Sequence, residues 1–330
     1  MNYKAKIIKF TETTVKLVIV LLGIWILYKK LIHNQNITVL WQDISISFKE
    51  KKQFNLMIIA VALMSLNQYL ESLKWKIQVK PIENISYYKS FLSIFTGISA
   101  GMFFPNRMGN FLGRIFMLEK GDRIKAAMLT LVGGMAQMIA TVGIGLLATL
   151  FFIEKHIVII SIGIIILIST LTLLYFNIHL LKYVQFLIPK RFKEKTQSYV
   201  EIFSKYKRKE LFMILILSFL RYFLYTFQFI LLLWAFNFPL SYFKTLIPIA
   251  LTYLMMMIIP FITIMEIAVR GSVSILVFEK WLLINGINIS YNNIVFSASS
   301  LLWIINIAIP ALIGLFLTHK LKFFREKNES

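Results

Sequence analysis

Two segments of the sequence place arginine close to a proline in otherwise apolar surroundings. In the first, Pro105 is followed by Arg107, Gly109, Asn110 and Arg114. Arginine is costly in lipid, so its presence there indicates a functional site. Arg107 and Arg114 lie about two helical turns apart and share a helix face, from which they could bind a phosphate through paired hydrogen bonds. The pattern predicts an anion site with Asn110 as a further contact. In the structural alternative, Arg107 only extends toward the cytoplasmic interface.

The second segment begins at Pro260 and carries Glu266 and Arg270. These two charged residues are four positions apart, so they are neighbours on one face of a helix. They are expected to form an ion pair inside the membrane or a gate that opens on protonation. A purely structural role, in which each neutralises the other, is an equal alternative.

Three other polar residues lie within apolar stretches. Arg221 is a weaker candidate for a third anion contact. Gln137 is expected to form a packing hydrogen bond rather than to contact a substrate. Glu71 is expected at the membrane interface, paired with Lys74 or Lys76.

The sequence offers little for catalysis or metal binding. It contains no cysteine, and none of its four histidines has a second histidine at ligand spacing. No nucleophile–base group and no Walker motif appears. The protein is therefore predicted to be no enzyme and to use neither a metal nor another cofactor.

Composition places the chain in a membrane. The 330 residues are 58% hydrophobic, and several segments reach transmembrane length. The formal net charge of +21 would suggest nucleic acid as the partner of a soluble protein. Here the basic residues cluster between apolar spans, so the charge indicates orientation and attraction to anionic lipid headgroups, with no nucleic acid partner.

The apolar pattern predicts an all-α polytopic fold with about six full transmembrane helices. The expected spans are Val15–Ile32, Phe54–Leu73, Met128–Phe152, Ile157–Tyr175, Phe212–Phe236 and Val295–Leu317. Between the first two, residues 37–48 are expected to lie at the interface with Trp41 as an anchor, or to form a short strand.

Two apolar stretches are interrupted and are expected to be re-entrant helical hairpins. Phe91–Phe104 holds 14 residues, so as a helix it reaches about 21 Å, short of the roughly 30 Å hydrocarbon core. Asn106–Leu118 then returns, with the break at Pro105 and Gly109. The second hairpin is Phe243–Ile259 and Phe261–Phe278, broken at Pro260. Irregular backbone at this depth must be buried in protein or line a water-filled cavity.

The order of spans and hairpins predicts an inverted repeat of residues 1–153 and 154–330 within a single membrane domain. The two hairpin prolines are 155 positions apart, and the following helices carry Asn110 and Arg114 in one case and Glu266 and Arg270 in the other. Inverted repeats with broken helices are typical of transporters. Chance similarity between apolar segments is the alternative.

The basic segments predict the orientation. The stretch 177–210 and the C-terminal tail hold many lysines and arginines, which favours the cytoplasmic side. Both termini of this multi-pass protein of the cell (inner) membrane are then cytoplasmic. Lys49, Lys51 and Lys52 would lie outside and disagree with this topology.

The first motif, PNRMGNFLGR at 105–114, resembles the hallmark of the lysylphosphatidylglycerol synthase transmembrane-region family, whose members are also described as flippase-like. The family pattern is a proline, an arginine, a glycine, an acidic residue and an arginine, and Asn110 stands at the acidic position. Pro260, Glu266 and Arg270 resemble a second signature. The resemblance implies two re-entrant hairpins and a role in moving or handling lipids. The soluble aminoacyl-transferase domain of well-known members is not expected here.

These observations favour a flippase-like transporter that translocates or handles a phosphate-bearing lipid. The expected partner is a membrane phospholipid or a polyprenyl-phosphate lipid, bound by Arg107, Asn110, Arg114, Glu266 and Arg270. The alternative is a non-transporting membrane partner of an enzyme of envelope lipid or glycan biosynthesis, docked through the basic 177–210 stretch. A homo-oligomer is compatible with either function.

Overall fold

The computed structural model describes residue 14 and residues 37–104, 109–119, 122–180, 201–259 and 266–317, and every regular element within these ranges is helical. The first expected span, Val15–Ile32, lies outside the described residues. The α-helices are, in chain order, α2 (Ile37–Ser47), α3 (Lys51–Val79), α4 (Tyr87–Gly101), α5 (Gly109–Ile115), α6 (Arg123–Thr149), α7 (Ile157–Phe176), α9 (Arg208–Ala235), α10 (Tyr242–Ile258), α11 (Glu266–Ile284), α12 (Asn292–Trp303) and α13 (Ile309–Leu317).

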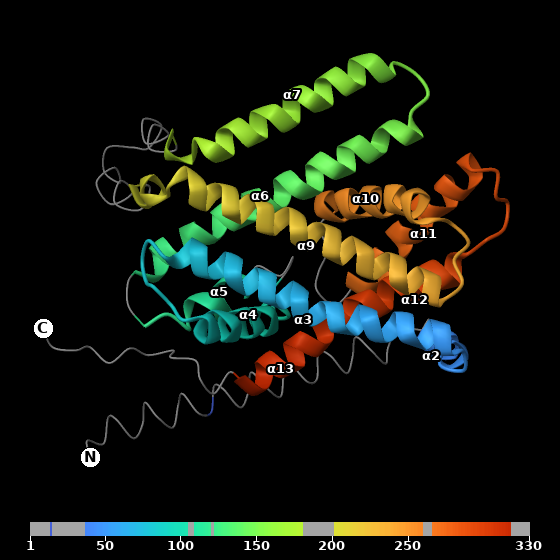
Figure 1. The fold of residues 1–330 in the computed structure, drawn as a ribbon, viewed down its shortest axis with the longest axis horizontal. Coiled ribbons are helices and arrows are strands. Elements are labelled where there is room, and N and C mark those ends of the chain that lie inside the picture. Colours follow the sequence, from blue (N-terminus) through green and yellow to red (C-terminus); the bar gives the residue numbers. More distant parts are fainter. Residues whose placement is uncertain are drawn as a thin grey trace, which may run out of the picture.

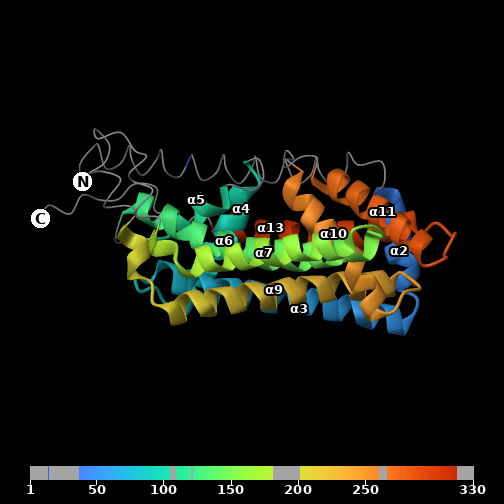
Figure 2. The same ribbon diagram turned by 90° about the horizontal axis from the view of Figure 1, so that it is seen from above.

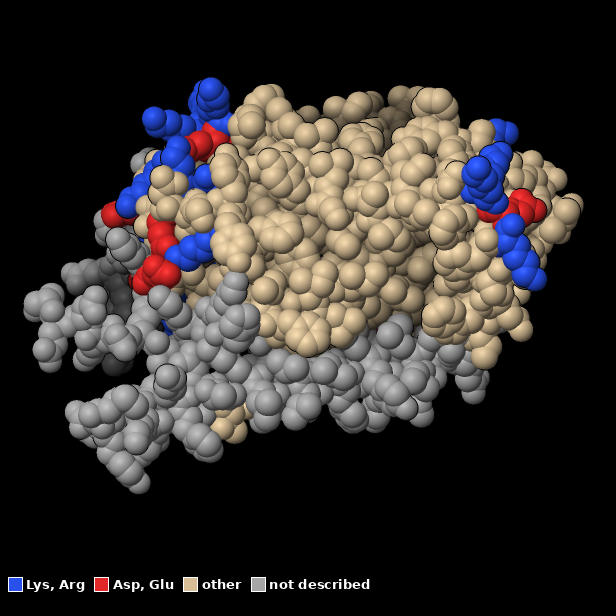
Figure 3. All heavy atoms as spheres, turned by 60° about the horizontal axis from the view of Figure 1, so that its bottom comes forward, with Lys and Arg blue, Asp and Glu red and all other residues tan. Residues whose placement is uncertain are grey.

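Five of the described helical segments are long and apolar enough to cross a bilayer. They are α3, α6 with its 3-10 extension through Phe152, α7, α9 and the continuous stretch Asn292–Leu317. Charged side chains gather at the two ends of the face shown in Figure 3, and a broad uncharged band separates them. The protein is therefore an all-α, multi-pass membrane protein, as the composition predicted.

The long helices α3 and α9 lie side by side and form one layer of the bundle (Figures 1 and 2). α6 packs across α9, and α7 lies on the outside (Figure 1). In α7 the structure buries only Ile164 and Tyr175, and the Tyr175 hydroxyl donates to the Leu211 carbonyl at 2.8 Å. The rest of α7 presents an apolar surface of the kind that lipid covers.

The first expected hairpin consists of two short helices, α4 and α5, packed against each other. Thr96 Oγ1 donates to the Gly113 carbonyl at 3.3 Å, which joins the two helices. At Gly109 a side chain would collide with the carbonyl oxygen of Ala100, so glycine permits this close approach. Pro105, the expected break, lies outside the described residues. That the hairpin is re-entrant stays a prediction.

The last helix, α13, completes the packing around α4. Ser99 Oγ donates to the Ala311 carbonyl at 2.6 Å. Gly314 lies directly against the Phe95 carbonyl, leaving no room for a Cβ atom.

Replacing Gly314 by alanine is therefore expected to destabilise the fold by about 2 kcal/mol, because the added methyl group forces two helix backbones apart. Thermal unfolding of the detergent-solubilised protein measures the loss. Gly163→Ala in α7 is the control, since a Cβ there has open space beside it. Equal unfolding temperatures for the two variants would contradict the close approach of α4 and α13.

The second expected hairpin corresponds to α10 and α11, which also pack against each other. α11 extends to Ile284, beyond the expected end at Phe278. Pro260, its expected break, lies outside the described residues. The inverted repeat of 1–153 and 154–330 and the re-entrant path of this hairpin stay predictions.

The segment after the first expected span is helix α2, so the short-strand alternative is wrong. Trp41 is 64% exposed on α2, and its role as an interfacial anchor stays a prediction. Asp43 accepts a hydrogen bond of 2.5 Å from the Ser297 hydroxyl, which ties α2 to α12.

Candidate functional site

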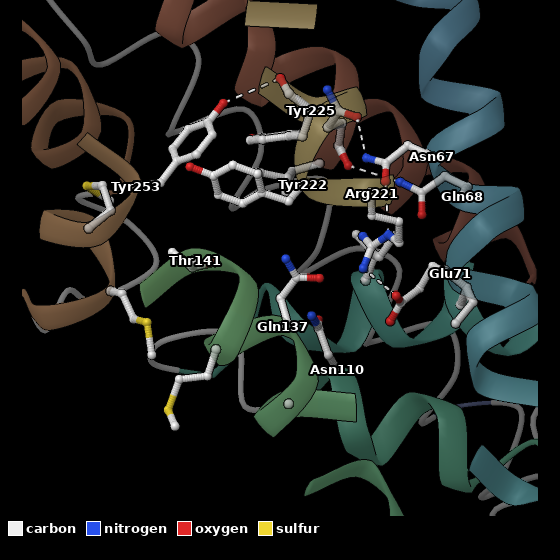
Figure 4. Close-up of a pocket in the computed structure, with 18 of the residues that line it drawn as sticks. Asn67, Gln68, Glu71, Asn110, Gln137, Thr141, Arg221, Tyr222, Tyr225 and Tyr253 are labelled. Atoms are coloured by element: carbon white, nitrogen blue, oxygen red, sulfur yellow. Dashed lines mark hydrogen bonds and ion pairs between the residues drawn. The ribbon is translucent and has the colours of Figure 1, made fainter. Parts of the chain in front are cut away.

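A cavity of about 520 Å³ opens between the helices of the bundle, lined by residues of α3, α4, α5, α6, α9, α10, α11 and the segment between α12 and α13 (Figure 4). Such a volume lies within the roughly 300–1,000 Å³ of typical small-molecule sites. The lining brings together Asn110, Arg114, Glu266 and Arg270, four of the residues that the sequence singled out. Arg107 and the two prolines lie outside the described residues. A role of these side chains in binding stays a prediction.

The carboxylate of Glu71 on α3 is the centre of the charged part of the cavity. Arg114 Nη1 lies 2.7 Å from Glu71 Oε1, and Lys74 Nζ lies 2.8 Å from Oε2. Arg221 of α9 also donates to Oε2 through Nη1. Glu71 is only 5% exposed. Three cations on one buried carboxylate leave two positive charges in excess.

Asn67 and Gln68 precede Glu71 by four and three positions, so all three are near one another on α3. Asn67 Oδ1 accepts from Arg221 Nε at 2.9 Å. Its Nδ2 donates to Asn306 Oδ1 at 3.1 Å, and Gln68 Nε2 donates to the Asn306 carbonyl at 3.4 Å. This network holds the Arg221 guanidinium in place beside Glu71.

The Asn306 carbonyl lacks the usual helical donor four positions later, because that residue is a proline. Pro310 has no N–H to donate to it, and residues 304–308 form a π-helical turn between α12 and α13. Such turns occur frequently at functional sites. Here the turn presents both the side chain and the carbonyl of Asn306 to α3.

Glu266 and Arg270 form the expected ion pair, with Arg270 Nη2 at 3.4 Å from Glu266 Oε1. Both belong to the first turns of α11, and Glu266 is fully buried. Because they line the same cavity as Arg114, the structure joins the two sequence motifs in one site.

Methionine and tyrosine side chains form the less polar wall. The rings of Tyr222 and Tyr253 have centroids 5.8 Å apart, and those of Tyr225 and Tyr253 are 5.5 Å apart. Met138, Met256 and Met257 complete this wall. Tyrosine offers an apolar ring with a polar tip, which suits contact with an amphiphile.

The structure places Glu71 and Gln137 on the wall of the cavity. The pairing of Glu71 with Lys74 is confirmed, and two arginines also contact this carboxylate, which is buried within the protein. The position of Glu71 at the membrane interface stays a prediction. Gln137 Oε1 has no hydrogen-bond partner in the described part of the chain and lines the cavity. The signal that could have located Glu71 is the polar cluster of Asn67, Gln68 and Glu71 on one apolar helix.

Within the described ranges no group of three histidine, cysteine or acidic residues could hold a metal ion. The described side chains that line the cavity include arginine, carboxylate, amide and phenol groups.

The chain matches a model of a protein family. The model is described as the lysylphosphatidylglycerol synthase TM region, and it aligns with residues 13–281. The match includes the segments of both motifs and most of the helices that line the cavity. No curated protein and no solved structure matches the chain.

Proposed function

The chain belongs to the lysylphosphatidylglycerol synthase transmembrane-region family, and from this premise we propose that it binds the phosphate of a lipid headgroup in the cavity and moves that headgroup across the membrane. The family relates the chain to lipid handling. The transport step and the phosphate ligand are the additions that we propose, with no chemical change to the lipid.

The observation that carries this proposal is the convergence of Arg114, Arg221 and Lys74 on Glu71. These four residues come from α3, α5 and α9, and a buried excess of positive charge attracts an anion strongly where water is scarce. Guanidinium groups match phosphate oxygens in geometry as well as charge. A lipid phosphate can therefore compete with Glu71 for these three cations.

The methionine and tyrosine side of the cavity suits the less polar part of an amphiphilic lipid. The methionine and tyrosine wall is less polar, and α3, α6 and α9 beside the cavity are long enough to span the bilayer. The lipid headgroup would lie in the cavity while its acyl or prenyl chains stay in the surrounding bilayer. The protein would then shield the headgroup from the hydrocarbon core as it crosses. Polar groups in contact with hydrocarbon are costly, so such shielding lowers the barrier to crossing.

Reconstituted in liposomes with a fluorescent phospholipid, the wild-type protein is expected to speed its movement between leaflets. Arg114→Gln removes one phosphate contact and is expected to slow this movement about tenfold or more. Arg208→Gln is the matched control, because Arg208 is an exposed arginine at the start of α9. The proposal fails if the wild type moves none of a panel of phosphate-bearing lipids, or if the two variants are equally active.

A further inference from the structure

The hydrogen bonds between Arg221 and Asn306 form a chain with a single direction. Arg221 Nε donates to Asn67 Oδ1 at 2.9 Å, and Asn67 Nδ2 donates to Asn306 Oδ1 at 3.1 Å. Asn306 Nδ2 in turn donates to the Leu302 carbonyl at 3.2 Å. A carbonyl can only accept, so it fixes which side of the Asn306 amide carries the oxygen. The Asn306 amide then fixes the orientation of Asn67.

The orientation of the Asn67 amide decides whether Arg221 has an acceptor. An amide turned the other way would place its NH2 group against Arg221 Nε, donor against donor. Asn67 and Asn306 are both buried, so water offers little replacement for a lost bond. Leaving a buried donor without an acceptor is costly, and Asn306 prevents this by accepting from Asn67 Nδ2.

The same contacts leave one Arg221 nitrogen for a ligand. Nε is held by Asn67 and Nη1 by Glu71, and Figure 4 shows the guanidinium between these two side chains. Nη2 makes no hydrogen bond within the described part of the chain, and the Arg221 side chain is partly exposed on the cavity wall. A guanidinium is planar and rigid, so two held nitrogens determine where the third one points.

Asn306 also lines the cavity, but the protein engages each of its polar groups. Its side chain bonds Asn67 and Leu302, and its carbonyl accepts from Gln68 Nε2 at 3.4 Å. The effect of Asn306 on a bound anion therefore passes through Asn67 to Arg221.

We infer that Asn306 is a positioning residue of the anion site, which holds the Asn67 amide so that Arg221 presents Nη2 to a lipid phosphate. The ligand in this inference rests on the proposed function, whereas the orientation of Arg221 does not. The π-helical turn gains a role, because it brings Asn306 to α3. Residue 306 lies beyond the matched residues 13–281, so the site includes a contribution from outside that segment.

The Nε–H signal of Arg221 tests the relay without any lipid. In the full chain with isotope-labelled arginine, magnetic resonance identifies this signal by its loss in Arg221→Gln. Asn306→Leu removes the amide at similar volume and is expected to speed exchange of the Nε proton with water about tenfold, as for one lost hydrogen bond. Gln228→Leu is the matched control, since it removes a buried amide bond from α9 to the Ala60 carbonyl of α3 and leaves the relay intact.

A second substitution separates orientation from a general loss of structure. Asn67→Asp is expected to restore slow exchange in Asn306→Leu, because a carboxylate accepts through either oxygen and needs no orienting partner. If Asn306→Leu does not fold, Asn306→Ser replaces it, since the serine hydroxyl stops one bond short of the amide oxygen.

Affinity for phosphatidic acid, measured by native mass spectrometry, tests the link to the ligand. Asn306→Leu is expected to weaken binding about fivefold when Arg221 is present and to have no further effect in Arg221→Gln. This loss of effect is specific to a residue that acts through Arg221.

The outcomes separate this inference from the proposed function. Equal exchange rates in Asn306→Leu and Gln228→Leu, or the same loss of affinity with and without Arg221, would overturn the inference and leave the phosphate site standing. If the wild type binds no phosphatidic acid, or if Arg114→Gln binds it as tightly as the wild type, the proposed function fails, and the exchange measurement still decides whether Asn306 positions Arg221. Full competition by inorganic phosphate would uphold the positioning role and overturn the lipid as the source of the phosphate.

Discussion

Replacing Glu71 by glutamine is expected to destabilise the protein by about 3 kcal/mol or more, because buried Lys74 and the partly buried Arg114 and Arg221 then lose their shared counter-charge. Thermal unfolding in detergent measures the effect. Glu210→Gln is the control: its partner Lys80 is exposed, and exposed pairs contribute about 1 kcal/mol or less. An unfolding temperature equal to that of the control would show that the cluster does not depend on Glu71.

Two further measurements identify the cause of this destabilisation. In the double variant Glu71→Gln/Arg221→Gln, one of the unpaired cations is removed. Its loss of stability is therefore expected to be smaller than the sum of the losses of the two single variants. Anionic lipid supplies a replacement charge and is expected to stabilise Glu71→Gln more than the wild type. Simple additivity, with no response to anionic lipid, would mean that packing rather than charge explains the loss.

Filling the cavity is expected to stop transport without altering any charged residue. Gly134 of α6 lines the cavity, and a Cβ there meets no atom within 4 Å. Gly134→Leu therefore places a side chain where the headgroup would lie, and movement between leaflets is expected to fall to about a tenth of wild type or less. The reconstituted lipid assay measures the rate.

The matched control is Gly163→Leu on α7, which also has open space beside it but faces the outside of the bundle. Leucine is the better helix former by up to about 1 kcal/mol, so neither variant is expected to lose stability. If Gly134→Leu folds normally and transports at the rate of Gly163→Leu, the headgroup does not pass through this cavity.

The spans could be predicted from the sequence because apolar length is a local property. Phe212–Phe236 was expected, and α9 runs from Arg208 to Ala235. The expected span Phe54–Leu73 lies within α3, which continues to Val79, two residues before Pro81. Neither inference requires knowledge of which helices are neighbours.

The cavity could be predicted only in part, because its centre depends on how distant helices align. Asn110, Arg114, Glu266 and Arg270 stand out as polar groups beside proline breaks. The local sequence does not predict the contact between Arg221 and Glu71. These residues are 150 positions apart and meet only because α9 packs on α3. The contact of Asn306 with α3 could not be predicted for the same reason. The sequence does show that Pro310, four positions later, cannot donate a helical hydrogen bond to the Asn306 carbonyl.

The cluster around Glu71 also has an order of assembly. As the chain is synthesised, Glu71 and Lys74 emerge together, Arg114 follows about 40 residues later, and Arg221 after a further hundred or so. Glu71 and Lys74 are three positions apart on one helix, so they can pair as soon as α3 forms. A neutral local pair therefore enters the membrane first, and the positive excess arises only when the arginines of later helices arrive.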